Sequence, residues 1–132
     1  MFPDAFGGHL WSAMLSVQIA LPIQNAPRTK RFEALIDSGA GRCLFHSDFA
    51  THLGIDYKSC PVETTVGIGG NEDTYLHDLK LYIPGGPVTI KAGFKENLPI
   101  AGLLGMAGFF EHFKLTFDGS AQICILERHF QA

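Results

Sequence analysis

Hydrophobic and polar residues alternate along much of the chain, and this alternation predicts β-strands. Between positions 15 and 21, leucine, valine and isoleucine occupy every second position, with serine, glutamine and alanine between them. A second alternating stretch, residues 31–37, follows a polar loop at 22–30 that contains two prolines. A period of two is typical of a strand with one buried face. The two stretches therefore predict an antiparallel hairpin with a long connection.

The remainder of the chain shows the same period, interrupted by turns and by short helical segments. Further strands are predicted at 62–66, 75–83, 88–94, 114–117 and 122–126, with turns at 84–87 and 118–119. Ser47 is a suitable N-cap for a helix over 48–53, and a second short helix is predicted at 106–112. That second helix should pack its aromatic residues into the core: Phe109, Phe110 and Phe113. About seven or eight strands with one or two short helices indicate a mostly β fold.

The length of 132 residues is that of one domain. We expect an N-terminal arm at 1–12, a folded domain at 13–127 and a C-terminal tail at 128–132. Glycine is frequent, with 15 residues, which favours the tight turns of β structure. The formal net charge of −3 gives no electrostatic reason to expect a nucleic acid or an anionic membrane as a partner.

The three cysteines, at 43, 60 and 124, form no C-x-x-C pair, so neither a disulfide framework nor a structural zinc site is expected. The six histidines lack metal-ligand spacing, and we expect no metal and no cofactor. Cys43 and His46 are three apart in a predicted strand and would point to opposite faces, which argues against a thiol nucleophile. Free thiols, no apolar run of 18 residues and no signal-peptide pattern lead us to expect a cytoplasmic protein.

The most informative segment for chemistry is Leu35-Ile36-Asp37-Ser38-Gly39-Ala40, in which a carboxylate ends an apolar strand. A lone carboxylate is costly to bury at such a point. The Ser38 hydroxyl can donate a hydrogen bond, and Gly39 permits a tight turn that brings its N–H toward the carboxylate. Such donors favour the ionised form. For the tripeptide alone, an Asx-type turn after a strand is the alternative interpretation.

Three segments, in order, resemble the retropepsins, the single-domain aspartic proteases of retroviral type, including their bacterial members. Asp37-Ser38-Gly39-Ala40 matches the catalytic loop of that family. Val66-Gly67-Ile68-Gly69-Gly70, followed by an alternating strand, resembles its β-hairpin flap. Leu103-Leu104-Gly105, followed by residues 106–118, is similar to the segment that crosses behind the catalytic loop and to the helix and strand after it. The resemblance covers about residues 15–126 and implies a closed retropepsin-like barrel.

The resemblance implies an aspartic endopeptidase, active as a homodimer on an extended peptide or protein substrate. In such an enzyme two carboxyl groups share one proton, and the ionised one activates a water. The sequence has one motif of this kind, so a second copy must supply the second carboxylate. Asp37 would be catalytic, with its loop supported by Ser38, Gly39 and Ala40. The flap would comprise Gly67, Ile68, Gly69 and Gly70, and the candidates for the substrate pocket are Phe45, Ile68 and Leu103.

One position departs from the family pattern. Many members carry an arginine after the apolar-apolar-glycine segment, where its charge pairs in the subunit interface, but this chain has Met106. The departure leaves the mode of dimerisation open, and the arm and tail are candidates for interface strands. The alternative function is a catalytically silent retropepsin-like module that binds peptides or mediates assembly. A third possibility is a β-barrel binding module of another fold.

Overall fold

The computed structural model describes residues 2–3, 9–10, 13–37, 39–67, 70–118 and 123–128. The strands are β1 (Phe2–Pro3), β2 (His9–Leu10), β3 (Ala13–Ala20), β4 (Phe32–Ile36), β5 (Leu44–His46), β6 (Val62–Gly67), β7 (Gly70–Ile83), β8 (Gly86–Lys95), β9 (Gly102–Leu104), β10 (Phe113–Asp118) and β11 (Ile123–Arg128). The described helices are α1 (Ser47–His52) and the short 3-10 helix η1 (Tyr57–Ser59). The fold is mostly β, as predicted.

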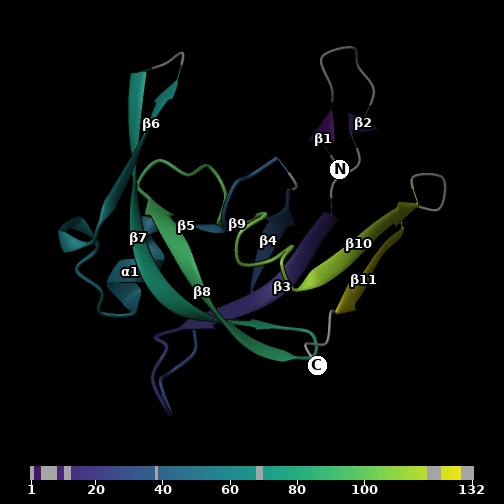
Figure 1. Ribbon diagram of the computed structural model, residues 1–132, viewed down its shortest axis with the longest axis horizontal. Coiled ribbons are helices and arrows are strands. Elements are labelled where there is room, and N and C mark those ends of the chain that lie inside the picture. The colour runs from purple at the N-terminus through teal and green to yellow at the C-terminus, as the bar shows by residue number, and fades with distance from the viewer. Residues whose placement is uncertain are drawn as a thin grey trace.

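Seven strands form one sheet in the order β3-β4-β9-β5-β8-β7-β6 (Figure 1). The sheet returns on itself because β3 pairs with β4 through residues 13–17 and with β7 through residues 18–20. The result is a ring of strands rather than strictly the closed barrel that the sequence predicts, since β5 and β9 contribute only three residues each. The β6–β7 hairpin extends beyond the ring (Figure 1).

The hairpin predicted at the start of the domain is confirmed as β3 and β4, which pair antiparallel. Val17 and Ile19 are fully buried on β3, and Ala34 and Ile36 are buried on β4. The long β7–β8 hairpin contributes its own alternate residues to the same core, namely Leu79, Leu81, Ile83, Val88, Ile90 and Ala92. Because every second residue faces the inside of the ring, the period read from the sequence becomes the hydrophobic core.

Helix α1 begins one residue earlier than predicted, and His46 rather than Ser47 is its N-cap. The backbone of His46 is extended, and its Nδ1 accepts a hydrogen bond from the N–H of Asp48 at 3.1 Å. Ser47 is instead a buried residue of the first turn. The usual N-cap acceptor is a side-chain oxygen of serine, threonine, aspartate or asparagine. In this helix an imidazole nitrogen takes its place.

The helix predicted at 106–112 is wrong, because this segment forms a series of turns. Gly108 has a φ of +100°, which no right-handed helix accommodates. The expected aromatic packing is nevertheless present. Phe109 is fully buried and stacks on Phe113 with ring centroids 4.9 Å apart, while Phe110 meets Phe109 edge-on. The turns thus deliver to the core the side chains that the helix was expected to deliver.

Two smaller sheets lie at the ends of the chain. β1 pairs with β2 in the predicted arm, and β10 pairs with β11 as the predicted hairpin, although Gly119 of its turn lies outside the described residues. Within the described ranges, no helix is both long enough and apolar enough to cross a membrane.

Candidate active site

Asp37 lies directly after β4, at the point where this strand runs beside β9. The two strands are parallel, with Ile36 opposite Leu104. The N–H of Asp37 donates to the carbonyl oxygen of Leu104 at 3.0 Å, which continues the ladder by one residue. Its carboxylate is partly exposed, and Oδ1 accepts a hydrogen bond from the N–H of Gly39 at 2.9 Å. The strand pairing fixes the backbone of Asp37, and the turn fixes one carboxylate oxygen.

The loop after Asp37 is held from behind by the segment that succeeds β9. The N–H of Met106 donates to the carbonyl of Ala40 at 2.9 Å, and the N–H of Ala107 donates to Gly41 at 3.0 Å. In return, the N–H of Cys43 donates to Ala107 at 3.2 Å. These bonds confirm the crossing expected from the Leu103-Leu104-Gly105 motif, and they make the loop part of the sheet framework.

Two glycines allow these close approaches. A Cβ on Gly105 would lie 2.4 Å from the carbonyl oxygen of Arg42 and 2.7 Å from that of Ala40, so only glycine fits where the segments cross. A Cβ on Gly39 would lie 3.1 Å from Oδ1 of Asp37, against the carboxylate itself. The N–H of Gly39 and the carbonyl of Ala40 thus take part in holding this loop, but their supporting role in catalysis stays a prediction. Ser38 lies outside the described residues.

The segment predicted to be a flap forms the tip of the β6–β7 hairpin. Gly67 pairs with Gly70, which has a φ of +115°. Ile68 and Gly69, between them, lie outside the described residues. Val66 beside the tip is 81% exposed, an unusual position for an apolar side chain. The hairpin is confirmed, whereas closure of its tip over a substrate stays a prediction.

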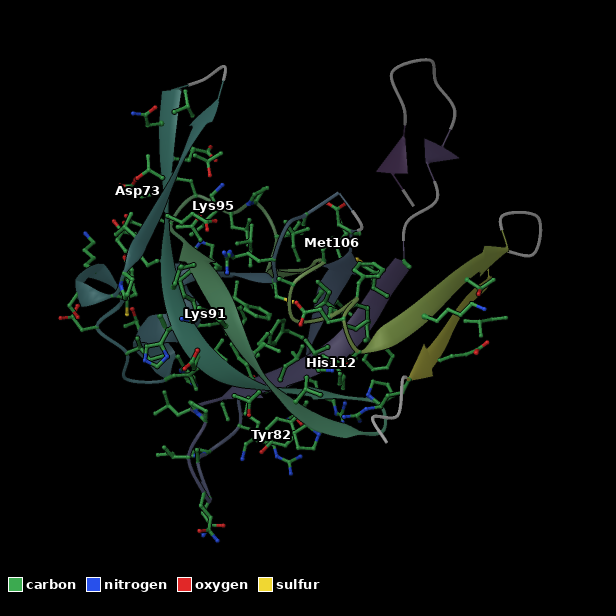
Figure 2. The ribbon with its side chains drawn as sticks, viewed as in Figure 1. Asp73, Tyr82, Lys91, Lys95, Met106 and His112 are labelled. Atoms are coloured by element: carbon green, nitrogen blue, oxygen red, sulfur yellow. The ribbon has the colours of Figure 1, made fainter. Side chains whose placement is uncertain are left out.

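Ion pairs connect both strands of this hairpin to the body of the domain. In the loop after Asp37, Nη2 of Arg42 lies 2.7 Å from Oε2 of Glu63 on β6. At the end of β8, the ammonium of Lys95 (labelled in Figure 2) is paired with the carboxylate of Glu72 on β7. Such partly exposed pairs add little stability, about 0–1 kcal/mol each. The sequence reasoning missed Arg42, although a cation five residues after Asp37 was a visible signal.

The remaining predicted residues lie in different surroundings. Phe45 is fully buried in the core, where its ring meets Phe32 edge-on, so we do not retain it as a pocket residue. Leu103 is partly buried and pairs with Leu35 and Leu44 in the sheet. Met106, labelled in Figure 2, is 50% exposed beside the loop that follows Asp37.

A thiol nucleophile finds no support at this site. Cys43 is fully buried, and burial raises the pKa of its thiol to about 11. His46 already uses Nδ1 to accept the N–H of Asp48. A neutral, buried thiol is inert at ordinary pH, which agrees with the expectation that Cys43 is a structural residue.

Comparison with known proteins agrees with this geometry. A family model described as aspartyl protease matches residues 23–107. A retropepsin-like aspartic protease from Rickettsia conorii is similar in structure, with a TM-score of 0.60, 20% identity and coverage of 87% of this chain and 88% of that chain. No curated protein sequence matches the chain.

Two further solved structures share the arrangement. The EIAV protease in complex with an inhibitor has a TM-score of 0.54 and 17% identity over 71% of this chain and 81% of that one. The retroviral protease-like domain of Ddi1 from Leishmania major has a TM-score of 0.56 and 17% identity over 86% of this chain and 88% of that one. At these identities the structures show that the fold is retropepsin-like. The family model covers well over half of the residues, and the chain therefore belongs to the aspartyl protease family.

Proposed function

We propose that the chain is an aspartic endopeptidase that works as a homodimer, with Asp37 of each copy supplying one carboxyl group of the catalytic pair. The observation that carries the proposal is the placement of Asp37. It is a partly exposed carboxylate, held by the N–H of Gly39, on a loop that the 105–107 segment braces from behind. Membership of the aspartyl protease family supports a catalytic role for a carboxylate in this position.

The chemistry needs two carboxyl groups. Like charges about 3 Å apart do not both ionise, so the pair shares one proton. The ionised carboxyl removes a proton from the water that attacks the peptide carbonyl, and the neutral one donates a hydrogen bond to the carbonyl oxygen. Asp-Ser-Gly occurs once in the sequence, at Asp37, so one copy of the chain supplies one of the two groups. A two-fold axis beside Asp37 supplies the other.

The substrate is an extended peptide that binds as an added strand, with its side chains in alternate pockets. The tip at Gly67–Gly70 closes over it, since glycine tolerates the backbone changes that such a motion needs. The pairs Arg42–Glu63 and Lys95–Glu72 connect the two strands of this hairpin to the body of the domain, and the tip beyond them moves. Ser38 braces the catalytic loop by a hydrogen bond to its counterpart in the partner copy.

The test is cleavage of a diverse peptide library between pH 3 and pH 7, with and without a statine-type inhibitor. Asp37→Asn should lower the rate roughly a hundredfold or more. Asp78→Asn makes the same chemical change at an exposed position on β7 and should leave the rate unchanged. Failure to cleave at concentrations where sedimentation shows a dimer would leave a silent peptide-binding or assembly module as the better description.

A mixing experiment tests the shared site directly. When wild type is mixed with an equal amount of Asp37→Asn chain, random pairing places half of the wild-type chains beside an inactive partner. Activity should then fall to about half of that shown by the same amount of wild type alone. Unchanged activity after subunit exchange would mean that each copy is catalytic by itself, which contradicts the proposal.

A further inference from the structure

A basic segment lies between β3 and β4, on a chain whose net charge is negative. Arg28, Lys30 and Arg31 are all exposed, whereas Thr29 between them is buried. Thr29 ties the segment to β3. Its N–H donates to the carbonyl of Ile19 at 3.0 Å, and its Oγ1 accepts the N–H of Ile19 at 3.1 Å. The three cationic side chains are therefore presented from a fixed backbone rather than from a loose loop.

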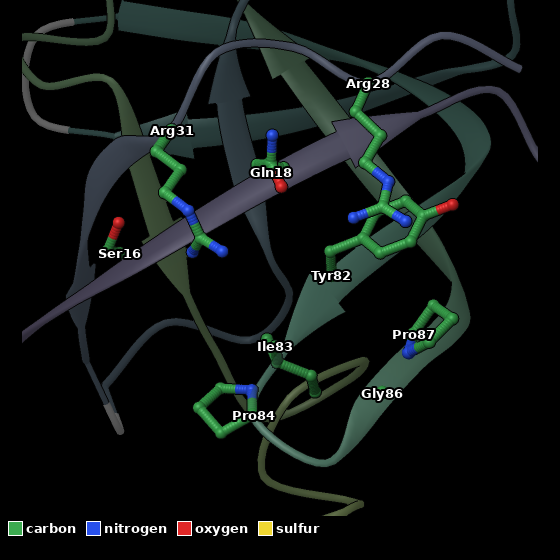
Figure 3. A pocket seen from close by; sticks show the side chains of 9 residues that line it. All are labelled: Ser16, Gln18, Arg28, Arg31, Tyr82, Ile83, Pro84, Gly86 and Pro87. Carbon is green, nitrogen blue, oxygen red and sulfur yellow. The ribbon is translucent and has the colours of Figure 1, made fainter.

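Two of these cations, Arg28 and Arg31, line a cavity of about 440 Å³ (Figure 3). No residue of the loop after Asp37 lines it, so it is distinct from the candidate active site. The cavity lies between β3, the basic segment and the turn from β7 to β8, and its walls are Ser16, Gln18, Arg28, Arg31, Tyr82, Ile83, Pro84, Gly86 and Pro87. This volume lies in the range of small-ligand sites, about 300–1,000 Å³. The catalytic loop begins at the other end of β3, where Ala13 is opposite Ile36.

The cavity carries positive charge on the guanidinium groups of Arg28 and Arg31. The guanidinium of Arg28 lies 4.0 Å from the ring centroid of Tyr82, a cation–π contact that orients it. Among the described residues, no carboxylate lies within 4.0 Å of the Arg28 or Arg31 guanidinium. Arg128 adds a third guanidinium at the rim, where its Nη1 donates to the carbonyl of Gly86 at 3.1 Å.

We propose that this cavity is a second binding site, which takes the carboxylate side chains of an acidic peptide segment. The arginine fork matches a carboxylate with two parallel hydrogen bonds. Ser16 supplies a further polar group, and the apolar surfaces of Tyr82, Pro84 and Pro87 provide packing for the stem of a glutamate and for the peptide backbone. Complementarity of charge supports this assignment, because the site is positively charged although the chain has a net charge of −3.

The proposal is tested by binding of fluorescein-labelled hexaglutamate to the full chain, measured by fluorescence anisotropy at low salt. Hexaglutamine is the uncharged comparison and should bind at least tenfold more weakly. The double substitution Arg28→Gln with Arg31→Gln should weaken hexaglutamate binding at least tenfold, which is about 1.4 kcal/mol. Lys58→Gln with Lys114→Gln removes the same charge from exposed positions outside the cavity and should change the affinity less than twofold.

Three results would overturn the assignment. They are equal losses in the two double variants, no preference for hexaglutamate over hexaglutamine, and inorganic phosphate binding as tightly as the peptide, which would indicate a site for a small oxyanion. Far-UV circular dichroism of each variant checks that it is folded. The double substitution Arg28→Lys with Arg31→Lys keeps the positive charge but removes the forked guanidinium, and it should give an intermediate affinity. Binding is also measured in Asp37→Asn, where it should persist, so failure of the proposed protease activity is distinguishable from failure of this site.

Discussion

Replacing Gly105 by alanine should destabilise the protein through a clash that only a shift of the backbone can relieve. The added Cβ would lie 2.4 Å from the carbonyl oxygen of Arg42 and 2.7 Å from that of Ala40. Both are backbone atoms, so no side-chain rotation makes room. Overpacking of this kind costs about 1–3 kcal/mol. Moving the loop away also stretches the bonds from Met106 to Ala40 and from Ala107 to Gly41, which contribute about 1 kcal/mol each.

We therefore expect Gly105→Ala to lower the free energy of unfolding by about 3 kcal/mol, a large part of the total of about 5–15 kcal/mol that is usual for a domain. Urea denaturation monitored by far-UV circular dichroism measures this change. With an m-value of about 1–3 kcal/mol/M, the midpoint should fall by about 1–3 M. All variants are compared at one protein concentration, because the proposed dimerisation would make apparent stability depend on it.

Gly41→Ala is the matched control in the same loop. A Cβ on Gly41 has no neighbour within 4 Å, and its φ is not positive. Alanine there restricts the unfolded chain without straining the folded one, so stability should stay equal or rise by about 0.4–1 kcal/mol. The reasoning is refuted if Gly105→Ala proves as stable as Gly41→Ala, since both changes add the same methyl group and only the crossing of the two segments separates them.

Four further predictions concern the thiols, the pH dependence of stability, the core and the helix cap. Burial raises the pKa of the Cys43 thiol to about 11, so at pH 8 iodoacetamide should modify Cys60 before Cys43 in the folded chain. In urea it should modify both thiols. Fast labelling of Cys43 in the folded chain would contradict this prediction. Because the unfolded thiol ionises near 9.0, the folded state binds this proton more tightly, and stability should fall as the pH rises from about 9 toward 11. Phe109→Ala should lower the free energy of unfolding, measured by urea denaturation, by about 3–5 kcal/mol. Ile23→Ala, at a position that is 58% exposed, should lower it by less than about 0.5 kcal/mol. Similar losses in the two variants would exclude Phe109 from the core. His46→Ala should lose about 1 kcal/mol with the cap, and His46→Asn should retain most of it, an outcome that equal losses would contradict.

Several features were predictable because they depend on neighbours in the sequence. The alternation over 15–21 and 31–37 predicted the hairpin of β3 and β4, and the Asp37-Ser38-Gly39 segment predicted a carboxylate at the end of a strand. In both cases the pattern acts over a few residues, because side-chain direction alternates along a strand and a single turn ends that alternation. The N–H of Gly39 reaches the carboxylate two residues earlier, as a local turn requires.

Other features depend on segments that meet only in the folded chain. Residues 106–112 carry a helical pattern, yet Gly108 and the neighbouring turns depart from it while the segment passes behind the Asp37 loop. The Arg42–Glu63 pair likewise joins residues that are 21 positions apart in the sequence.

The sequence by itself determined the longer alternating strands, the order of the motifs and the position of a carboxylate at the end of a strand, because periodicity and a short motif are local properties. Only the tertiary structure decided why Gly105 must be glycine, which side chains reach the core from 106–112, and where Arg28 and Arg31 converge. These outcomes depend on distances between chain segments, which the closure of the ring of strands sets.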